Sequence, residues 1–96
     1  MPREVSLQTY TYAILKEVDS DSGMSKSAMA VMNSLLNLLA VRVSTVSVDL
    51  ARMSGRSTIQ ARDVKSAILR IFPKELSKHA YSEAEKATQK FQQSHA

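Results

Sequence analysis

The sequence contains no cysteine and no tryptophan, and only two of its 96 residues are glycine and two are proline. Without cysteine, the chain has no disulfide framework, no thiolate nucleophile and no cysteine–zinc site. Its two histidines, His79 and His95, lie far apart without a set of carboxylates around them, so we expect no metal and no cofactor. We also find no base–nucleophile pair and no glycine-rich phosphate loop, so we expect neither an enzyme nor a small-molecule substrate.

Positive charge is in moderate excess, with 13 lysines and arginines against nine acidic residues, a net charge of +4 and a pI near 9.6. A small basic domain favours anionic partners, first nucleic acid and then a membrane surface. The alternative is an ordinary surplus of surface lysine. A single domain of this length buries only a thin core by itself, so a partner chain is expected.

One long stretch, from Ser25 to Met53, has no glycine or proline and only four charged residues. As a helix it would span roughly 40 Å, whereas a domain of this length is about 25–30 Å across. A second protein should therefore cover its apolar side, although a central helix wrapped by its own chain is the alternative. The charge-free part, residues 27–41, is shorter than the ~20 residues of a membrane span, so we expect no membrane insertion. One apolar seam follows the helix: Ala28, Met32, Leu35, Leu39, Val43, Val46, Leu50 and Met53.

Three shorter helices are predicted around this stretch. The first covers Leu7–Val18, with Ser6 as its N-cap, and Ser25 is placed to cap the long helix. A third helix covers Gln60–Ile71, and Pro73 introduces a fourth over Lys74–Gln93. Helical spacing predicts one apolar face on each of them: Leu7, Tyr10, Ile14 and Val18 in the first helix; Val64, Ala67, Ile68 and Ile71, facing inward, in the third; Leu76, Ala80, Ala84, Ala87 and Phe91, opposite a charged face, in the fourth.

This order of helices, short, long, short and then an added amphipathic helix, resembles the histone fold, an all-α fold in which two chains cross their long helices in a handshake. Five blocks in the same order and spacing resemble core histone 2B: Tyr10-Thr11-Tyr12, Gly23-Met24-Ser25, residues 28–34, Arg56-Ser57-Thr58-Ile59 and residues 73–80. The similarity extends without a gap from Tyr10 to Phe91. It divides the chain into a short N-terminal segment (1–6), a histone fold (7–72) and a C-terminal helix with a frayed end (73–96).

The resemblance implies a nucleosome component that wraps and compacts double-stranded DNA without base specificity. Its partners would be a histone 2A-like chain in a heterodimer, and histones 3 and 4 in an octamer. It would act in the nucleus on the chromosome, or in a virion or viral factory if a large DNA virus encodes it. The alternative is a histone-fold scaffold in a transcription or kinetochore complex with little DNA contact.

DNA contacts are implied by the resemblance at three places. The first loop would present Met24, Ser25 and Lys26 to a phosphate near a helix start. In the second loop Arg56 would enter a minor groove and Thr58 would bond a phosphate, with Ser57 between them. Arg3 and Tyr12 match positions close to the DNA backbone. Without the resemblance, Arg56-Ser57-Thr58 would be interpreted as a solvated turn and Lys26 as a surface lysine.

Protein contacts are implied on the last two helices. Glu75 and Glu83 match the carboxylates of the nucleosome acidic patch, although helix solubility is the alternative, and Lys90 aligns with the lysine to which the family attaches ubiquitin. The long helix would form the dimer and bundle interface through Met32, Leu35, Leu38, Leu39, Val46, Leu50 and Met53. Leu38 and Val46 replace acidic residues of the family and Met53 replaces a tyrosine. We therefore expect a co-diverged histone 4 with a more hydrophobic bundle. Gly55 replaces a basic residue beside the second-loop arginine.

Overall fold

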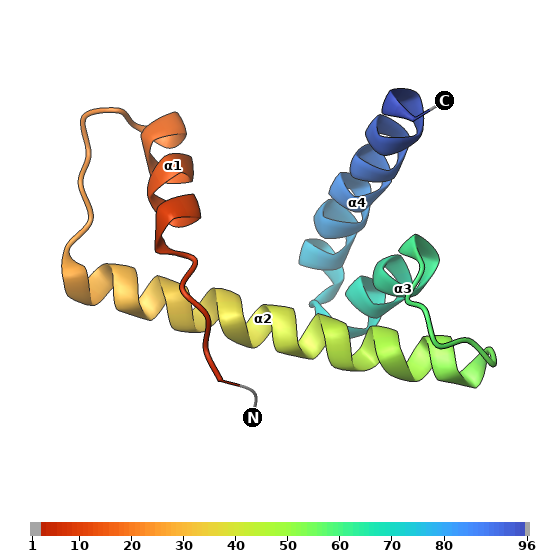
Figure 1. Cartoon of the computed structure of the whole chain (residues 1–96). Helices are drawn as coiled ribbons and strands as arrows, with labels where there is room; N and C mark the ends of the chain where they lie inside the picture. Colours follow the sequence, from red (N-terminus) through yellow and green to blue (C-terminus); the bar gives the residue numbers. More distant parts are fainter. Residues whose placement is uncertain (1–2, 96) are drawn as a thin grey trace. The chain divides into compact units, whose positions relative to one another are not determined.

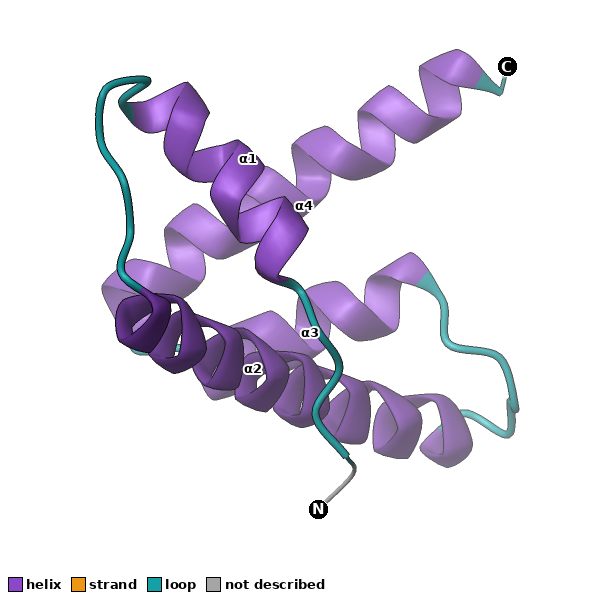
Figure 2. Cartoon of the chain, turned by 60° about the vertical axis from the view of Figure 1, so that its left-hand side comes forward, coloured by secondary structure: helices purple, strands orange, loops and turns teal. Residues whose placement is uncertain are grey.

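The computed structural model describes residues 3–95, which form four helices joined by short loops (Figure 1). The helices are α1 (Gln8–Val18), α2 (Lys26–Met53), α3 (Ala61–Ile71) and α4 (Lys74–Ser94). Residues 3–95 include no strand (Figure 2). The all-α class and the order of short, long, short and added helices are confirmed, and each observed end lies within one residue of its predicted position.

The starts of the helices follow the predicted caps in two cases and differ in one. The Ser25 hydroxyl accepts the Ala28 N–H at 3.1 Å, so the predicted N-cap of α2 is confirmed. Pro73 precedes the first residue of α4, also as predicted. The cap predicted at Ser6 is wrong, because Leu7 is the capping residue of α1 and no side chain caps that helix.

The chain divides into two compact units, and the boundary lies inside α2. Unit 1 ends at Val41 and contains the N-terminal segment, α1 and the first part of α2. Unit 2 begins at Arg42 and contains the rest of α2, α3 and α4. The ranges predicted from the resemblance, 1–6, 7–72 and 73–96, stay a prediction, and residues 1, 2 and 96 at their ends lie outside the described part.

In unit 1 the N-terminal segment runs across α2 and is bound there by side chains (Figure 1). Helix α1 buries Thr11, whereas Tyr10, Ile14 and Val18 of its predicted apolar face are all exposed. Of that face, Ile14 and Val18 line an apolar groove of about 280 Å³. The other residues of the groove are Thr11, Leu15, Met24, Met32 and Leu36. The apolar face of α1 is thus present but is not covered by its own chain.

In unit 2, α3 packs against α4. Ala67 of α3 is fully buried, and the predicted inward residues Val64, Ile68 and Ile71 are half-buried. Of the apolar face predicted for α4, Ala80 and Ala84 are half-buried, Leu76, Ala87 and Phe91 are exposed, and the buried residue of the helix is Ser77. An ion pair between Lys65 and Glu85 further joins the two helices.

Helix α2 buries small and polar residues within its own chain and leaves its apolar seam only partly covered, with Met32, Leu39, Val43, Val46 and Leu50 half-buried. Its buried residues are Asn33, Asn37, Ser47 and Ala51. Exposed on it are Val31, Leu35, Leu38 and Met53, the last to 80%. Uncovered apolar surface of this extent on a small chain indicates an interaction site.

By length and composition alone, α2 could also cross a membrane. The prediction against a membrane span counted only the charge-free residues 27–41, whereas the whole helix has 28 residues, about 42 Å. Length therefore does not exclude a span. The core helix of a protein that needs a partner chain can have the same length and composition. Length and composition therefore do not distinguish a membrane span from such a core helix, and the protein family must decide between them.

Candidate functional site

The second loop, between α2 and α3, begins with a left-handed residue. Gly55 has φ +73°, a conformation that L-residues rarely adopt. Its N–H donates to the Arg52 carbonyl at 2.9 Å, and the Arg56 N–H donates to the Ala51 carbonyl at 2.9 Å. These two bonds form a Schellman motif, which satisfies the last carbonyls of α2. The motif fixes the backbone of Arg56 against the end of α2.

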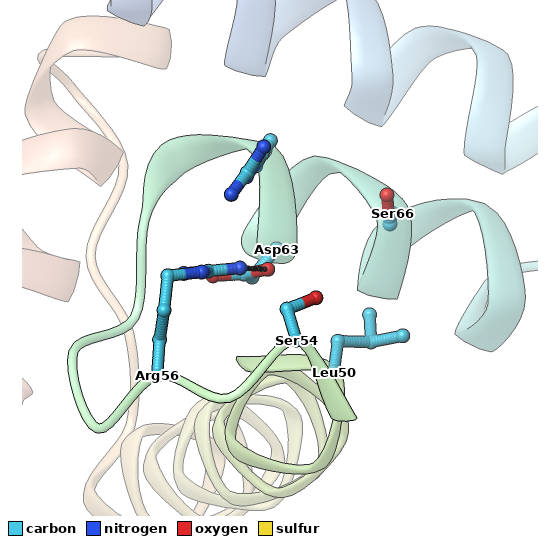
Figure 3. A pocket seen from close by; sticks show the side chains of 6 residues that line it. Leu50, Ser54, Arg56, Asp63 and Ser66 are labelled. Atoms are coloured by element: carbon cyan, nitrogen blue, oxygen red, sulfur yellow. Dashed lines mark hydrogen bonds and ion pairs between the residues drawn. The ribbon is translucent and has the colours of Figure 1, made fainter. Parts of the chain in front are cut away.

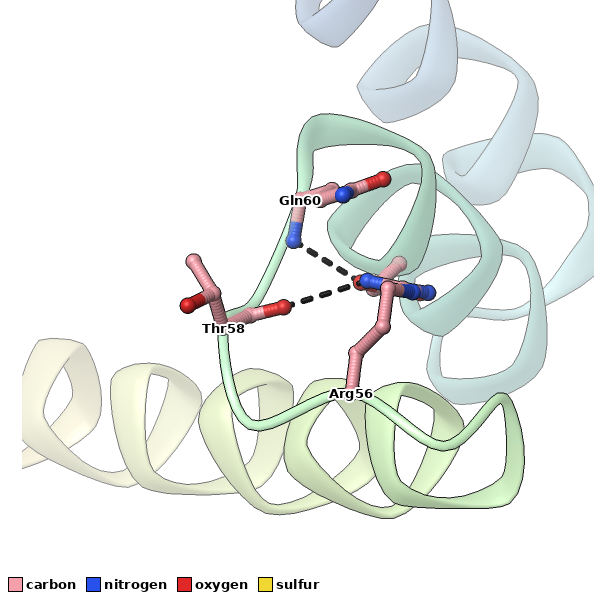
Figure 4. Close-up of polar contacts among 4 residues, drawn as sticks. Arg56, Thr58 and Gln60 are labelled. Carbon is pink, nitrogen blue, oxygen red and sulfur yellow. Dashed lines mark hydrogen bonds and ion pairs between the residues drawn. The ribbon is translucent and has the colours of Figure 1, made fainter.

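The side chain of Arg56 then crosses the loop to Asp63 in α3. Its two terminal nitrogens donate to the two carboxylate oxygens at 2.8 Å each, a bidentate pair (Figure 3). The same guanidinium donates to the Thr58 carbonyl at 3.1 Å, and the Gln60 N–H donates to the Asp63 carboxylate at 2.8 Å (Figure 4). The second loop is therefore held at both ends and in its middle by one arginine and one aspartate.

The electrostatics of this pair follow from its burial and its bonds. Asp63 is 4% exposed. The hydrogen bond from Arg56, and then the one from the Gln60 N–H, lower the pKa of Asp63 to about 2. The bond to Asp63 also raises the pKa of Arg56 above its usual value. Both groups are therefore charged at any pH above about 3.

These contacts give Arg56 a role within the chain that the sequence did not predict. The resemblance placed its guanidinium in a DNA minor groove, whereas the structure shows it paired with Asp63 inside the chain. Ser57 and Thr58 are exposed on the loop that the pair fixes. Sequence reasoning missed Asp63, although one signal was present: Gln60 and Asp63 have the spacing of a capping box, which the structure confirms.

A cavity of about 220 Å³ lies beside this pair (Figure 3). It is lined by Leu50 and Ser54 from the end of α2, by Arg56, and by Arg62, Asp63 and Ser66 from α3. The Arg56 Nε is buried there and has no hydrogen-bond partner among the described residues. The cavity thus belongs to the fixed second loop.

The first loop, between α1 and α2, is organised by Lys16 and Asp19. The Lys16 ammonium donates to the Ser22 carbonyl at 2.6 Å and the Ser20 carbonyl at 3.2 Å, and it lies 5.1 Å from the centre of the Tyr12 ring. The Asp19 carboxylate accepts the Asp21 N–H at 3.0 Å and the Ser22 hydroxyl at 2.8 Å. These two bonds lower the pKa of Asp19, the backbone one most.

The residues predicted for DNA fall into two groups, one in each unit. In unit 1, Arg3, Tyr12, Ser25 and Lys26 are exposed and Met24 is half-buried. Met24 and Lys26 line a further cavity, of about 350 Å³, with Gln8 and Met29. In unit 2, Ser57 and Thr58 are exposed and Arg56 is half-buried. Of these residues, Met24 and Lys26 line one cavity in unit 1 and Arg56 binds Thr58 in unit 2, whereas no hydrogen bond or ion pair within residues 3–95 joins Arg3 or Tyr12 to the first-loop residues.

The acidic residues predicted on α4 are exposed, as is Lys90. Glu83 pairs with Lys86 at 3.2 Å, and both side chains are mostly solvated, so this pair contributes little to stability. Glu75 and Glu83 are eight residues apart, which is about 2.2 turns, so their directions differ by roughly 80°. A difference of this size lies within one broad helical face, as for other residues eight apart, so both carboxylates lie on the same side of α4.

The residues predicted for the dimer and bundle interface are only partly covered. Leu35, Leu38 and Met53 are exposed, and Met32, Leu39, Val46 and Leu50 are half-buried. Both Met32 and the apolar groove of unit 1 are therefore open to a partner.

Among residues 3–95, no group of three or more histidine, cysteine, aspartate or glutamate side chains could hold a metal ion. Comparison with protein families gives a match over residues 3–71 to the core histone domain, the domain shared by histones 2A, 2B, 3 and 4. The match includes α1, α2, α3 and both loops between them, which is more than half of the chain. The chain therefore belongs to the core histone family and has the histone fold.

Proposed function

We propose that this protein is a histone 2B-like core histone, which pairs with a histone 2A-like chain and wraps DNA together with histones 3 and 4. The observation that carries the proposal is α4, which follows α3 after Phe72 and Pro73 and packs against it. The resemblance assigns an added helix at this point to histone 2B among the core histones.

Membership of the core histone family supports the general part of the proposal, which is DNA binding and pairing with another histone-fold chain. Proteins of this family generally bind DNA, form heterodimers with other histone-fold chains and are not enzymes, and they generally act in chromatin. The net charge of +4 suits a DNA partner. The partly covered seam of α2 and the groove of unit 1 suit a second histone-fold chain, because both are apolar.

We propose that the DNA contacts come from the exposed members of the two groups. Ser57 and Thr58 would meet phosphates from the second loop, and Lys26, Tyr12 and Arg3 would meet them from unit 1. Arg56 would act mainly by fixing the second loop through Asp63, since three of its N–H bonds are already made within the chain. Such contacts neutralise and position DNA without reading bases.

We further propose that Glu75 and Glu83 receive arginine-bearing chromatin factors and that Lys90 accepts ubiquitin. A more hydrophobic histone 4 would cover Leu38, Val46 and Met53, since Met53 and Leu38 are exposed and apolar in this chain. Salt-stable assembly with a conventional histone 4 at ordinary strength would argue against that last point.

The experiment is co-refolding with the histone 2A-like protein of the same genome, then with histones 3 and 4 and DNA, followed by nuclease digestion. Protection of about 146 bp is the expected result. A variant with Ser57→Glu and Thr58→Glu should shorten the protected fragment, because it places carboxylates at the proposed phosphate contacts. Ser82→Glu with Thr88→Glu on α4 is the charge-matched control.

One observation favours the scaffold alternative. The second loop has Gly55 in place of a basic residue, and the guanidinium of Arg56 is paired with Asp63. A histone-fold scaffold would form the heterodimer but give no nuclease protection, and that outcome would replace the nucleosome proposal.

A further inference from the structure

Two asparagines on α2 bind the backbone of the N-terminal segment. The Asn37 side chain accepts the Val5 N–H at 2.9 Å and donates to the Val5 carbonyl at 2.9 Å. The Asn33 side chain accepts the Leu7 N–H at 2.7 Å and donates to the Val5 carbonyl at 3.2 Å. Asn37 also donates to the Asn33 carbonyl at 2.8 Å. We name this arrangement of Asn33, Asn37, Val5 and Leu7 the asparagine clasp.

The clasp has the geometry of a strand pairing made by side chains. It binds alternate residues of the segment, Val5 and Leu7, as a β-ladder does. Both asparagines are buried, at 8% and 9% exposure, and lie one turn apart on the same face of α2. All the segment's bonds in the clasp come from backbone atoms, so the clasp fixes the path of the segment whatever its side chains are.

Arg3 lies two residues before the clasp and is exposed. From Val5 its Cα can lie at most about 7 Å away, because an extended chain spans up to ~3.6 Å per residue. If the clasp were open, the nearest fixed point would be Gln8 at the start of α1, and the reach would be about 18 Å. The volume open to Arg3 would then grow roughly tenfold or more, which lowers its effective concentration at any one phosphate by a similar factor.

We propose that Asn33 and Asn37 are positioning residues for DNA binding, which hold Arg3 at a fixed phosphate by clasping the backbone of Val5 and Leu7. This inference rests on the proposed DNA-binding function. The two buried side-chain amides would act on DNA binding indirectly, by fixing the backbone of the segment that carries Arg3.

Amide hydrogen exchange tests the clasp without DNA. In the full chain, alone or refolded with its histone 2A-like partner, the Val5 and Leu7 amides should exchange at least tenfold more slowly than those of Arg3 and Glu4. Asn37→Asp should remove that protection by opening the clasp, because a buried carboxylate would face the Val5 and Asn33 carbonyl oxygens to which the Asn37 amide donates. Ser34→Asp, which adds the same charge at an exposed position of the same helix, should leave it unchanged. Unprotected Val5 and Leu7 amides in the natural sequence would overturn the proposal.

A double-mutant cycle tests the positioning of Arg3. Arg3→Ala should weaken DNA binding by the heterodimer about threefold in the natural sequence, as expected for one solvated ion pair. In the Asn37→Asp background the same change should have almost no effect, and in the Ser34→Asp background it should keep its threefold effect. If Asn37→Asp fails to fold, Val5→Pro can replace it, because it removes one N–H of the clasp and leaves α2 intact. Arg3→Ala should then have almost no effect in the Val5→Pro background.

The outcomes separate the two proposals. Equal effects of Arg3→Ala in the Asn37→Asp and natural backgrounds, or no effect in either, would overturn the positioning role while DNA binding stands. Complete absence of DNA binding by the natural heterodimer would overturn both the proposed function and the positioning role, even if hydrogen exchange shows the clasp to be formed.

Discussion

The two units of this protein fasten a non-helical segment to their helices by different chemistry. In unit 1 the asparagine clasp uses neutral amides against backbone groups. In unit 2 the second loop is held by a charged pair, Arg56 and Asp63, which also binds the loop backbone. Both devices are mostly buried, and both satisfy polar groups that would otherwise be orphaned. Any difference between the asparagine clasp and the Arg56–Asp63 pair in their response to pH or salt should therefore come from charge and not from solvent exposure.

The two fastenings should tolerate different conditions. Neutral amides do not titrate, so the clasp should be indifferent to pH and nearly indifferent to salt. A buried ion pair is more vulnerable, because removing one partner leaves the other charge desolvated and unpaired. The heterodimer with the histone 2A-like partner is the form of the protein in which this contrast can be measured.

The largest expected effect is that of Asp63→Ala. The change leaves the Arg56 guanidinium partly buried without its carboxylate and removes the acceptor of the Gln60 N–H. We expect thermal unfolding, followed by circular dichroism, to shift down by roughly 10 °C or more. Glu83→Ala, which removes an exposed carboxylate, is the control and should shift the midpoint by about a degree. Similar shifts for both variants would show that the buried Arg56–Asp63 pair contributes no more to thermal stability than an exposed carboxylate does.

The second prediction concerns pH. The pKa of Asp63 is lowered in the folded chain to about 2 from its usual value of 3.8. Its contribution to stability is therefore complete above about pH 4 and is lost as the pH falls towards about 2. Asp63→Asn does not titrate, so the stability difference between the natural sequence and this variant should shrink over that interval. A difference that stays constant from about pH 5 to about pH 2 would contradict the lowered pKa.

A smaller effect is expected from Asn37→Ala. Val5 would lose both of its bonds to Asn37, and the free energy of unfolding should fall by about 1–3 kcal/mol. Chemical denaturation at about pH 7 and at about pH 4.5 should give the same loss, because no charged group takes part in the clasp. Ser34→Ala on the same helix provides the baseline. A loss of stability that depends on pH would contradict the claim that the clasp of unit 1, unlike the ion pair of unit 2, is independent of pH.

The smallest effect is expected from Lys16→Met. This change removes the donor that binds the Ser20 and Ser22 carbonyls of the first loop, which are solvated enough to bind water instead. The free energy of unfolding should fall by less than about 1 kcal/mol, while the amides of residues 20–24 should exchange faster. Lys78→Met on the exposed side of α4 is the control for loss of a lysine. Unchanged exchange in the first loop would show that Lys16 does not organise it.

Local signals in the sequence were sufficient for the helices and for one cap. The absence of glycine and proline between Ser25 and Met53 predicted α2, and the hydroxyl of Ser25 predicted its start. The family blocks predicted the fold, and the match over residues 3–71 confirms the family.

Contacts between distant residues were not predictable in the same way. Asn33 and Asn37 appeared only as polar residues in an apolar helix, since nothing local shows that they bind Val5 and Leu7. Ser6 was predicted to cap α1, whereas the capping residue is Leu7, whose N–H is bound by the side chain of Asn33 in α2. The pairing of Arg56 with Asp63 was missed for a similar reason, as Asp63 belongs to the following helix, and the DNA contact of Arg56 stays a prediction.

The asparagine clasp has a consequence for the order in which the chain becomes ordered. Arg56 and Asp63 are seven positions apart in the sequence, whereas Val5 and Asn37 are 32 positions apart. The probability that a flexible chain closes a loop falls with about the 3/2 power of its length, which is roughly a tenfold difference between these two contacts. We therefore expect the second loop to close, from neighbouring residues alone, before the N-terminal segment binds to α2. During unfolding we expect the N-terminal segment, including Arg3, to detach from α2 before the second loop opens.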